Sequence, residues 1–140
     1  MKKFLDYLQL GVSIATIAGV CFAYQGFKET MELQRETYAI QLYNQYYDLY
    51  ERNCQLLDTN ITKIEKNWTD EYQAFAERVL FTSESIYNIR GGSFSWDKTI
   101  TYMLIPHLSY YETNQSVGDA FSEDFRSFYN EIKLKYFTRD

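Results

Sequence analysis

The sequence predicts an all-helical protein in which one N-terminal transmembrane helix continues into a small helical bundle. Two observations lead to this fold class. No charged side chain lies between Asp6 and Lys28, and neither proline nor glycine interrupts the chain from Lys28 to Arg90. We therefore expect two parts: residues 1–27, a tail with a membrane-spanning helix, and residues 28–140, a water-soluble helical bundle.

The uncharged window runs from Tyr7 to Phe27, which is 21 residues. About 20 helical residues cross the hydrocarbon core of a bilayer. A cleaved signal peptide, with a cleavage point after Ala23, is the alternative. We favour the anchor because the uncharged run is longer than a signal core and helix-compatible residues continue past it.

Small residues recur every fourth position in this window, and we expect them to form a helix-helix contact: Gly11, Ala15, Gly19 and Ala23. Stripes of small side chains let helices approach closely in a bilayer. A mildly polar stripe could line a pathway in a ring of helices or could bond its own backbone: Gln9, Ser13 and Thr16. Membrane lipid and further copies of the chain are the expected partners.

The first helix should continue to about Leu57, with an apolar arc wider than one buried face requires. Its core side is expected to hold Tyr38, Ala39, Leu42, Tyr46, Leu49, Tyr50, Leu56 and Leu57. Tyr43 and Tyr47 widen this arc, and we predict that they contact a second copy of the chain.

Three further helices are predicted from capping signals and apolar spacing. Thr69 should cap the second, and Gly91-Gly92 should end it. Ser95 should cap the third, and Pro106 should kink or end it. The last helix should carry one apolar face: Phe121, Phe125, Phe128, Ile132 and Tyr136.

The composition excludes several functions. The net charge is −5, which disfavours sequence-blind nucleic-acid binding because the nucleic-acid backbone is itself anionic. The two cysteines, Cys21 and Cys54, indicate no disulfide framework. His107 is the only histidine, so we expect no metal site, no cofactor and no enzymatic activity.

Glu84 is an acidic residue within an apolar helical pattern. A carboxylate near a core is costly unless it is paired, so we expect Glu84 to join a buried polar network with Tyr87 and Trp96, or to bond Arg90.

The succession of these motifs resembles a known group of proteins. A span is followed by a long polar-aromatic helix, Arg78-Val79-Leu80-Phe81, Glu84-Ser85-Ile86-Tyr87, Gly91-Gly92, Trp96 and the run Met103–Leu108. This pattern resembles the small bacterial membrane proteins grouped as DUF4760-like or phage abortive-infection proteins, and the resemblance implies anti-phage defence. A more remote likeness is to the single-span accessory protein of type VI-B CRISPR systems, whose soluble part is HEPN-like. The Arg-x4–6-His motif of HEPN ribonucleases is absent here.

The leading hypothesis is a self-associating single-pass effector or accessory protein of the bacterial inner membrane that acts by oligomerisation, with membrane perturbation or pore formation. The alternatives are a tethered adaptor that binds a partner protein and a descendant of HEPN-like ribonucleases. Lys2 and Lys3 favour a cytoplasmic N-terminus. The unpaired cysteines and the resemblance instead favour a cytoplasmic domain, the orientation that we expect.

Overall fold

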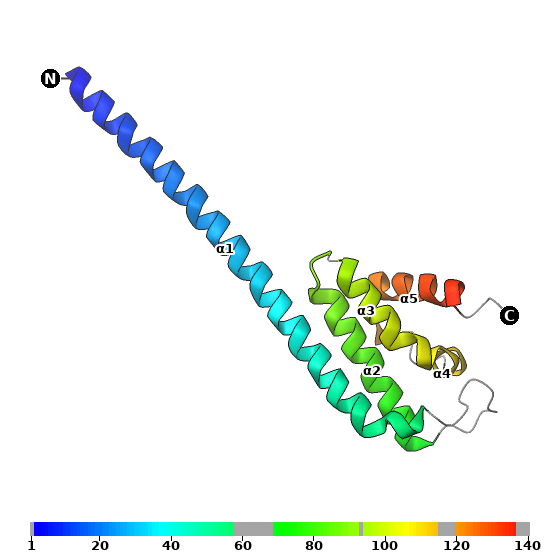
Figure 1. Cartoon of the computed structure of the whole chain (residues 1–140). Coiled ribbons are helices and arrows are strands. Elements are labelled where there is room, and N and C mark those ends of the chain that lie inside the picture. Colours follow the sequence, from blue (N-terminus) through cyan, green and yellow to red (C-terminus); the bar gives the residue numbers. More distant parts are fainter. Residues whose placement is uncertain (1, 58–68, 93, 115–119, 137–140) are drawn as a thin grey trace. The chain divides into compact units, whose positions relative to one another are not determined.

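The computed structural model consists of helices joined by short connections (Figure 1). It describes residues 2–57, 69–92, 94–114 and 120–136, and within these ranges it contains no strand. The side chains of residues 2–8, Leu10 and Phe94 lie outside the description. The chain divides into two units, residues 1–35 and 36–140, whereas the sequence placed the division at residues 27 and 28. The all-helical fold class is confirmed.

The first unit is helical from residue 2 to residue 35 and forms the beginning of helix α1, whose bounds are Lys2–Asn53. Every described side chain in this unit, beginning at Gln9, is exposed. The described side chains of this unit therefore form no core. Its helix is stabilised by backbone hydrogen bonds and by any contacts with surrounding molecules.

The predicted membrane span is not supported. In the described part of the chain, no helix combines the length and the apolar character needed to cross a membrane. The physical reason is that an uncharged stretch is not necessarily an apolar one. From Gly11 onward, the window contains Ser13, Thr16, Gln25 and three glycines, which lower its mean hydropathy. This finding overturns the expected localisation as a single-pass protein of the bacterial inner membrane, and with it the expected orientation.

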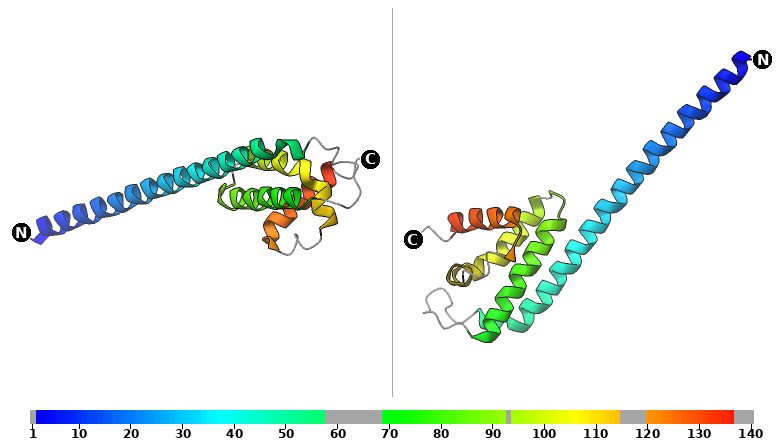
Figure 2. Two further views of the ribbon diagram at one scale, coloured as in Figure 1. Left: turned by 90° about the horizontal axis from the view of Figure 1, so that it is seen from below. Right: turned by 180° about the vertical axis from the view of Figure 1, so that it is seen from behind.

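The second unit contains the rest of α1 and all the later helices. A 3-10 turn η1 (Cys54–Leu56) follows α1, and then come α2 (Asp70–Ile89), α3 (Phe94–Leu104), η3 (Ile105–His107), α4 (Leu108–Thr113) and α5 (Glu123–Tyr136). In Figures 1 and 2, α2 runs beside the last turns of α1, and α3 runs back along α2.

Local capping defines the ends of α2 as the sequence predicted. The Thr69 hydroxyl accepts a hydrogen bond from the backbone N–H of Tyr72 at 3.2 Å, which satisfies one of the unpaired donors of the first turn. At the other end, Gly91 and Gly92 adopt φ angles of 62° and 84°. Side chains disfavour this left-handed region, so the two glycines let the chain turn sharply from α2 to α3.

The third predicted helix differs from the structure at both ends. Helix α3 begins at Phe94, so Ser95 lies inside its first turn instead of capping it. It ends at Leu104, and Pro106 lies in η3. Proline lacks an N–H and clashes with the preceding turn, which confirms that Pro106 ends the regular helix. Leu108 then begins the separate helix α4.

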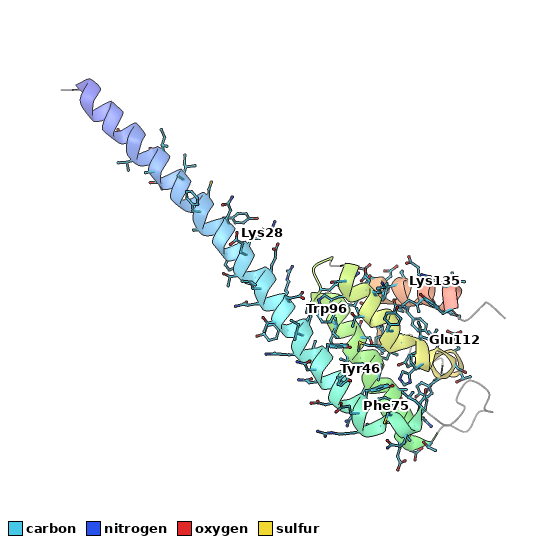
Figure 3. The ribbon with its side chains drawn as sticks, viewed as in Figure 1. Lys28, Tyr46, Phe75, Trp96, Glu112 and Lys135 are labelled. Atoms are coloured by element: carbon cyan, nitrogen blue, oxygen red, sulfur yellow. The ribbon has the colours of Figure 1, made fainter. Side chains whose placement is uncertain are left out.

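One apolar core unites the helices of the second unit. Helix α1 contributes Ala39 and Tyr46, which are buried, while Leu42, Leu49 and Tyr50 are half-buried. Tyr46 packs into the bundle beside helices that carry Phe75 and Trp96 (Figure 3). Tyr38 was predicted on this face but is exposed. The predicted face of the last helix is buried at Phe121, Phe125 and Ile132, whereas Tyr136 is exposed.

Helix α5 is tied to α2 by a side chain. The Glu84 carboxylate accepts a hydrogen bond from the backbone N–H of Ser122 at 2.7 Å. Ser122 immediately precedes α5, where N–H groups lack helical partners and negative charge is favoured. Glu84 therefore provides a hydrogen-bond acceptor at the N-terminus of α5, to Ser122, which lies 38 residues further along the chain.

We predict that Glu84→Ala lowers the free energy of unfolding by about 1–2 kcal/mol, the usual effect of losing a cap. Glu84→Gln keeps an acceptor oxygen and should lose less than half of that amount. Urea denaturation followed by circular dichroism would measure both. Equal losses in the two variants would show that the hydrogen bond to Ser122 contributes little.

Candidate functional site

The surface of the first unit is the most unusual feature of the described chain. Large apolar side chains project from α1 on all sides, and each is at least 60% exposed: Val12, Ile14, Ile17, Val20, Phe22, Tyr24 and Phe27. A group of exposed large apolar side chains often marks a surface that binds another molecule. Nothing within the first unit covers these residues, so they form a candidate interaction surface.

The glycines of this helix are not required by packing within the chain. A Cβ atom added at Gly11, Gly19 or Gly26 would meet nothing within 4 Å. Glycine within a helix is about 1 kcal/mol less favourable than alanine. Ala15 and Ala23 are also exposed, so the whole predicted contact stripe remains open for a neighbouring helix to approach.

The residues proposed to line a pathway bond their own helix. The Ser13 hydroxyl donates to the backbone carbonyl of Gln9 at 3.0 Å, and the Thr16 hydroxyl donates to that of Val12 at 2.9 Å. Gln9 is exposed. These hydrogen bonds satisfy the hydroxyls locally, so no polar pathway is needed to explain them.

The two tyrosines expected at an oligomer contact lie in different environments. Tyr43 is half-buried, and its ring lies 6.1 Å from Trp96 and 5.8 Å from Tyr46, so it packs within its own bundle. Tyr47 is 50% exposed, and its ring lies 6.5 Å from that of Tyr50. Tyr47 is therefore the one of the pair with surface available to another molecule.

The expected buried network is divided among three separate contacts. Glu84 bonds the backbone of Ser122. The Trp96 indole N–H donates to the Glu36 carboxylate at 3.0 Å. The Tyr87 ring stacks on Phe128 at 4.9 Å and carries the Arg90 guanidinium 3.5 Å from its centroid. The contacts of Glu84 and Tyr87 both join α2 with α5, whereas that of Trp96 joins α3 with α1, so the three residues stabilise the bundle without forming one site.

His107 is a buried polar residue in the core of the second unit. Its Nδ1 and the Tyr72 hydroxyl share a hydrogen bond of 2.9 Å, and its ring packs edge-on against Phe75 at 5.1 Å. Burial lowers the pKa of His107 from 6.5 to about 4, because a charged imidazolium would lose its hydration. Burial also raises the pKa of Tyr72, because a charged phenolate would lose its hydration.

The hydrogen bond between Tyr72 and His107 connects α2 with η3. The Tyr111 hydroxyl adds a second link by donating to the backbone carbonyl of Ala76 at 2.7 Å. His107 is only 1% exposed, which leaves no room for a substrate beside its ring. The sequence marked His107 as a structural group, but Tyr72 was not foreseen because 35 residues separate the two.

Two of the open grooves on the second unit have linings of different character. One, of about 460 Å³, lies between α1 and α2, and no charged residue lines it: Tyr38, Gln41, Leu42, Gln45, Ser85, Asn88 and Ile89. The other, of about 270 Å³, lies between α3 and α5 and includes Lys98, Glu131 and Lys135. Among the described residues, no group of histidine, cysteine or acidic side chains could hold a metal ion.

The buried histidine makes stability depend on pH. In the unfolded chain, His107 binds a proton below about pH 6.5. In the folded chain, it binds one only below about pH 4. We expect this residue to lower the free energy of unfolding by about 2 kcal/mol between pH 7 and pH 5. Urea denaturation at both pH values would measure the change, which His107→Gln should largely remove. The same decrease in that variant would assign the effect to other groups.

Comparison of the chain with protein-family models, with curated proteins and with solved structures found no match, so a proposal about function has to rest on the chain's own sequence and geometry.

Proposed function

We propose that the protein is a self-associating effector or accessory protein of antiviral defence and that its first helix is the element that assembles. The observation that carries this proposal is the row of exposed apolar side chains from Val12 to Phe27 on a helix with no covering partner in its own unit. The defence context comes from the resemblance of the sequence motifs to phage abortive-infection proteins.

The energetics favour a contact that buries several of these side chains together. Full burial of one valine, isoleucine or phenylalanine contributes about 1.5–3 kcal/mol, while association itself costs an estimated 4–15 kcal/mol. One or two buried residues would not offset that cost. Seven apolar residues of this segment are exposed, and because they lie on all sides of the helix, more than one neighbouring helix is needed to bury most of them.

Copies of the same helix fit this surface well. Gly11, Ala15, Gly19 and Ala23 let two backbones come close, and dispersion contacts increase as the helices approach. The open space around Gly11 and Gly19 supports the same arrangement. In the proposed assembly, the first helices pack together and the bundles of the second units become concentrated at one place.

A second candidate function is an adaptor that binds a different protein. The uncharged groove between α1 and α2 favours it, because amide groups on the rim and apolar residues below suit a neutral partner segment. An adaptor would be monomeric until its partner is added, so the oligomeric state separates the two functions.

The test is the mass of the purified full chain, measured by light scattering in a mild detergent whose contribution is subtracted. We expect a discrete oligomer for the natural sequence. The double variant Gly11→Leu/Gly19→Leu should shift the protein toward monomer, because two leucines per helix prevent close approach along the small-residue stripe.

The matched control is Gly11→Ala/Gly19→Ala, which shares the gain in helix propensity and keeps the side chains small. This control should retain the oligomer. A monomeric natural chain would refute self-association, and an unchanged oligomer in the leucine variant would exclude the stripe as the contact.

A further inference from the structure

The groove between α3 and α5 is lined by one row of side chains from each helix. Lys98 and Tyr102 line it from α3, and Phe128, Ile132 and Lys135 line it from α5. Intervals of three and four residues place each set on one face of its helix. Ile132 is buried and Phe128 is half-buried, whereas the other three side chains are exposed. The groove therefore has an apolar base with charged and aromatic side chains around it.

Two lysines give this groove a positive charge. Lys98 and Lys135 are exposed, and neither forms an ion pair with another described residue. Of the two carboxylates that line the groove, Asp97 is paired with Arg90, so only that of Glu131 opposes the lysines. Two ammonium groups against one carboxylate leave a local positive excess, although the chain as a whole has a net charge of −5. The groove is therefore suited to an anion.

Two tyrosine rings accompany the lysines. Tyr102 follows Lys98 by one helical turn and is 65% exposed, and no ring contact or hydrogen bond joins it to another described residue. Tyr136 follows Lys135 directly, and the Lys135 Nζ lies 5.1 Å from the centroid of its ring. An exposed aromatic ring offers a face on which a planar ring of a ligand can stack. The groove thus offers one partner for a charge and another for a ring.

We propose that this groove binds a small anion that carries a planar ring, with the chemistry of a nucleoside monophosphate. Lys98 and Lys135 attract the anionic group, the ring stacks on Tyr102, and Glu131 accepts a hydrogen bond from a hydroxyl or N–H group of the ligand. The proposal does not depend on self-association, because none of the residues that line the groove belongs to α1.

The size of the groove limits the ligand. Its volume of about 270 Å³ is slightly below the ~300 Å³ of the smaller ligand pockets in proteins, so it accommodates no more than one nucleotide. A long nucleic acid does not fit the charge of the chain either, because a net charge of −5 repels a polyanionic backbone.

Equilibrium dialysis of the full chain tests the site with AMP as the probe. Adenosine keeps the planar ring without the charge, and inorganic phosphate keeps the charge without the ring. We expect AMP to bind with a dissociation constant below about 1 mM, and each fragment to bind roughly tenfold more weakly. Absence of AMP binding, or binding of either fragment as tight as that of AMP, would overturn the proposal.

Charge variants test whether the two lysines are responsible. Lys98→Gln and Lys135→Gln should each weaken AMP binding by roughly fivefold, the upper range for an exposed charge pair. Arg126→Gln is the matched control, because Arg126 is exposed and lies roughly 180° around α5 from Lys135. The control should bind AMP as the natural chain does. Equal weakening in all three variants would assign the effect to overall charge and refute a site in the groove.

Variants of Tyr102 test the stacking contact. Tyr102→Leu removes the aromatic face and should weaken AMP binding by roughly tenfold, whereas Tyr102→Phe keeps the face and should retain the affinity. Because Tyr102 is exposed, both variants should melt at the temperature of the natural chain when followed by circular dichroism. Unchanged AMP binding in a folded Tyr102→Leu variant would contradict the assigned ring contact.

Discussion

The burial of α2 is the constraint on which the rest of the second unit depends. Seven of its side chains are buried, from Tyr72 to Ile86, and they spread over too much of the helix for one neighbour to cover. Helices before and after α2 must therefore surround it. The turn at Gly91-Gly92 makes this possible, because α3 then runs back along α2. The ion pair between Arg90 and Asp97 connects the two ends of that turn.

The polar contacts of the bundle complement this apolar packing. Tyr72 with His107, Trp96 with Glu36, and Glu84 with Ser122 each join segments that are distant in sequence. The Tyr72–His107 contact is buried, the Trp96–Glu36 contact is partly buried and the Glu84–Ser122 contact is exposed. Because a hydrogen bond requires a particular distance and direction, each pair favours one arrangement of its helices. Three such pairs connect α2 with η3, α3 with α1, and α5 with α2, which suits a small bundle with short helices.

Helix α1 links stability to the proposed function. Its core side completes the bundle through Ala39 and Tyr46, while Ile40, Tyr47 and the described side chains of residues 9–35 are exposed. A helix that belonged only to the bundle would carry polar residues on the outer side. The proposed association with another molecule depends on the exposed isoleucine, tyrosine and valine side chains of α1.

The sequence by itself determined the helical class, the start and end of α2 and the effect of Pro106, because capping residues, glycine and proline act on the backbone within a few residues. It also showed that α1 has too wide an apolar arc for one neighbour. Tertiary structure alone decided the partners of Glu84, Trp96 and His107, since hydrogen bonds across 35 to 60 residues leave no local pattern. It also distinguished Tyr43, which packs against Trp96, from Tyr47, which is exposed. The sequence alone does not distinguish these two tyrosines, because Trp96 is distant from both along the chain. The membrane assignment was wrong for a different reason: absence of charge was taken as apolar character, although the polar residues and glycines that lower the mean hydropathy of the window are visible in the sequence.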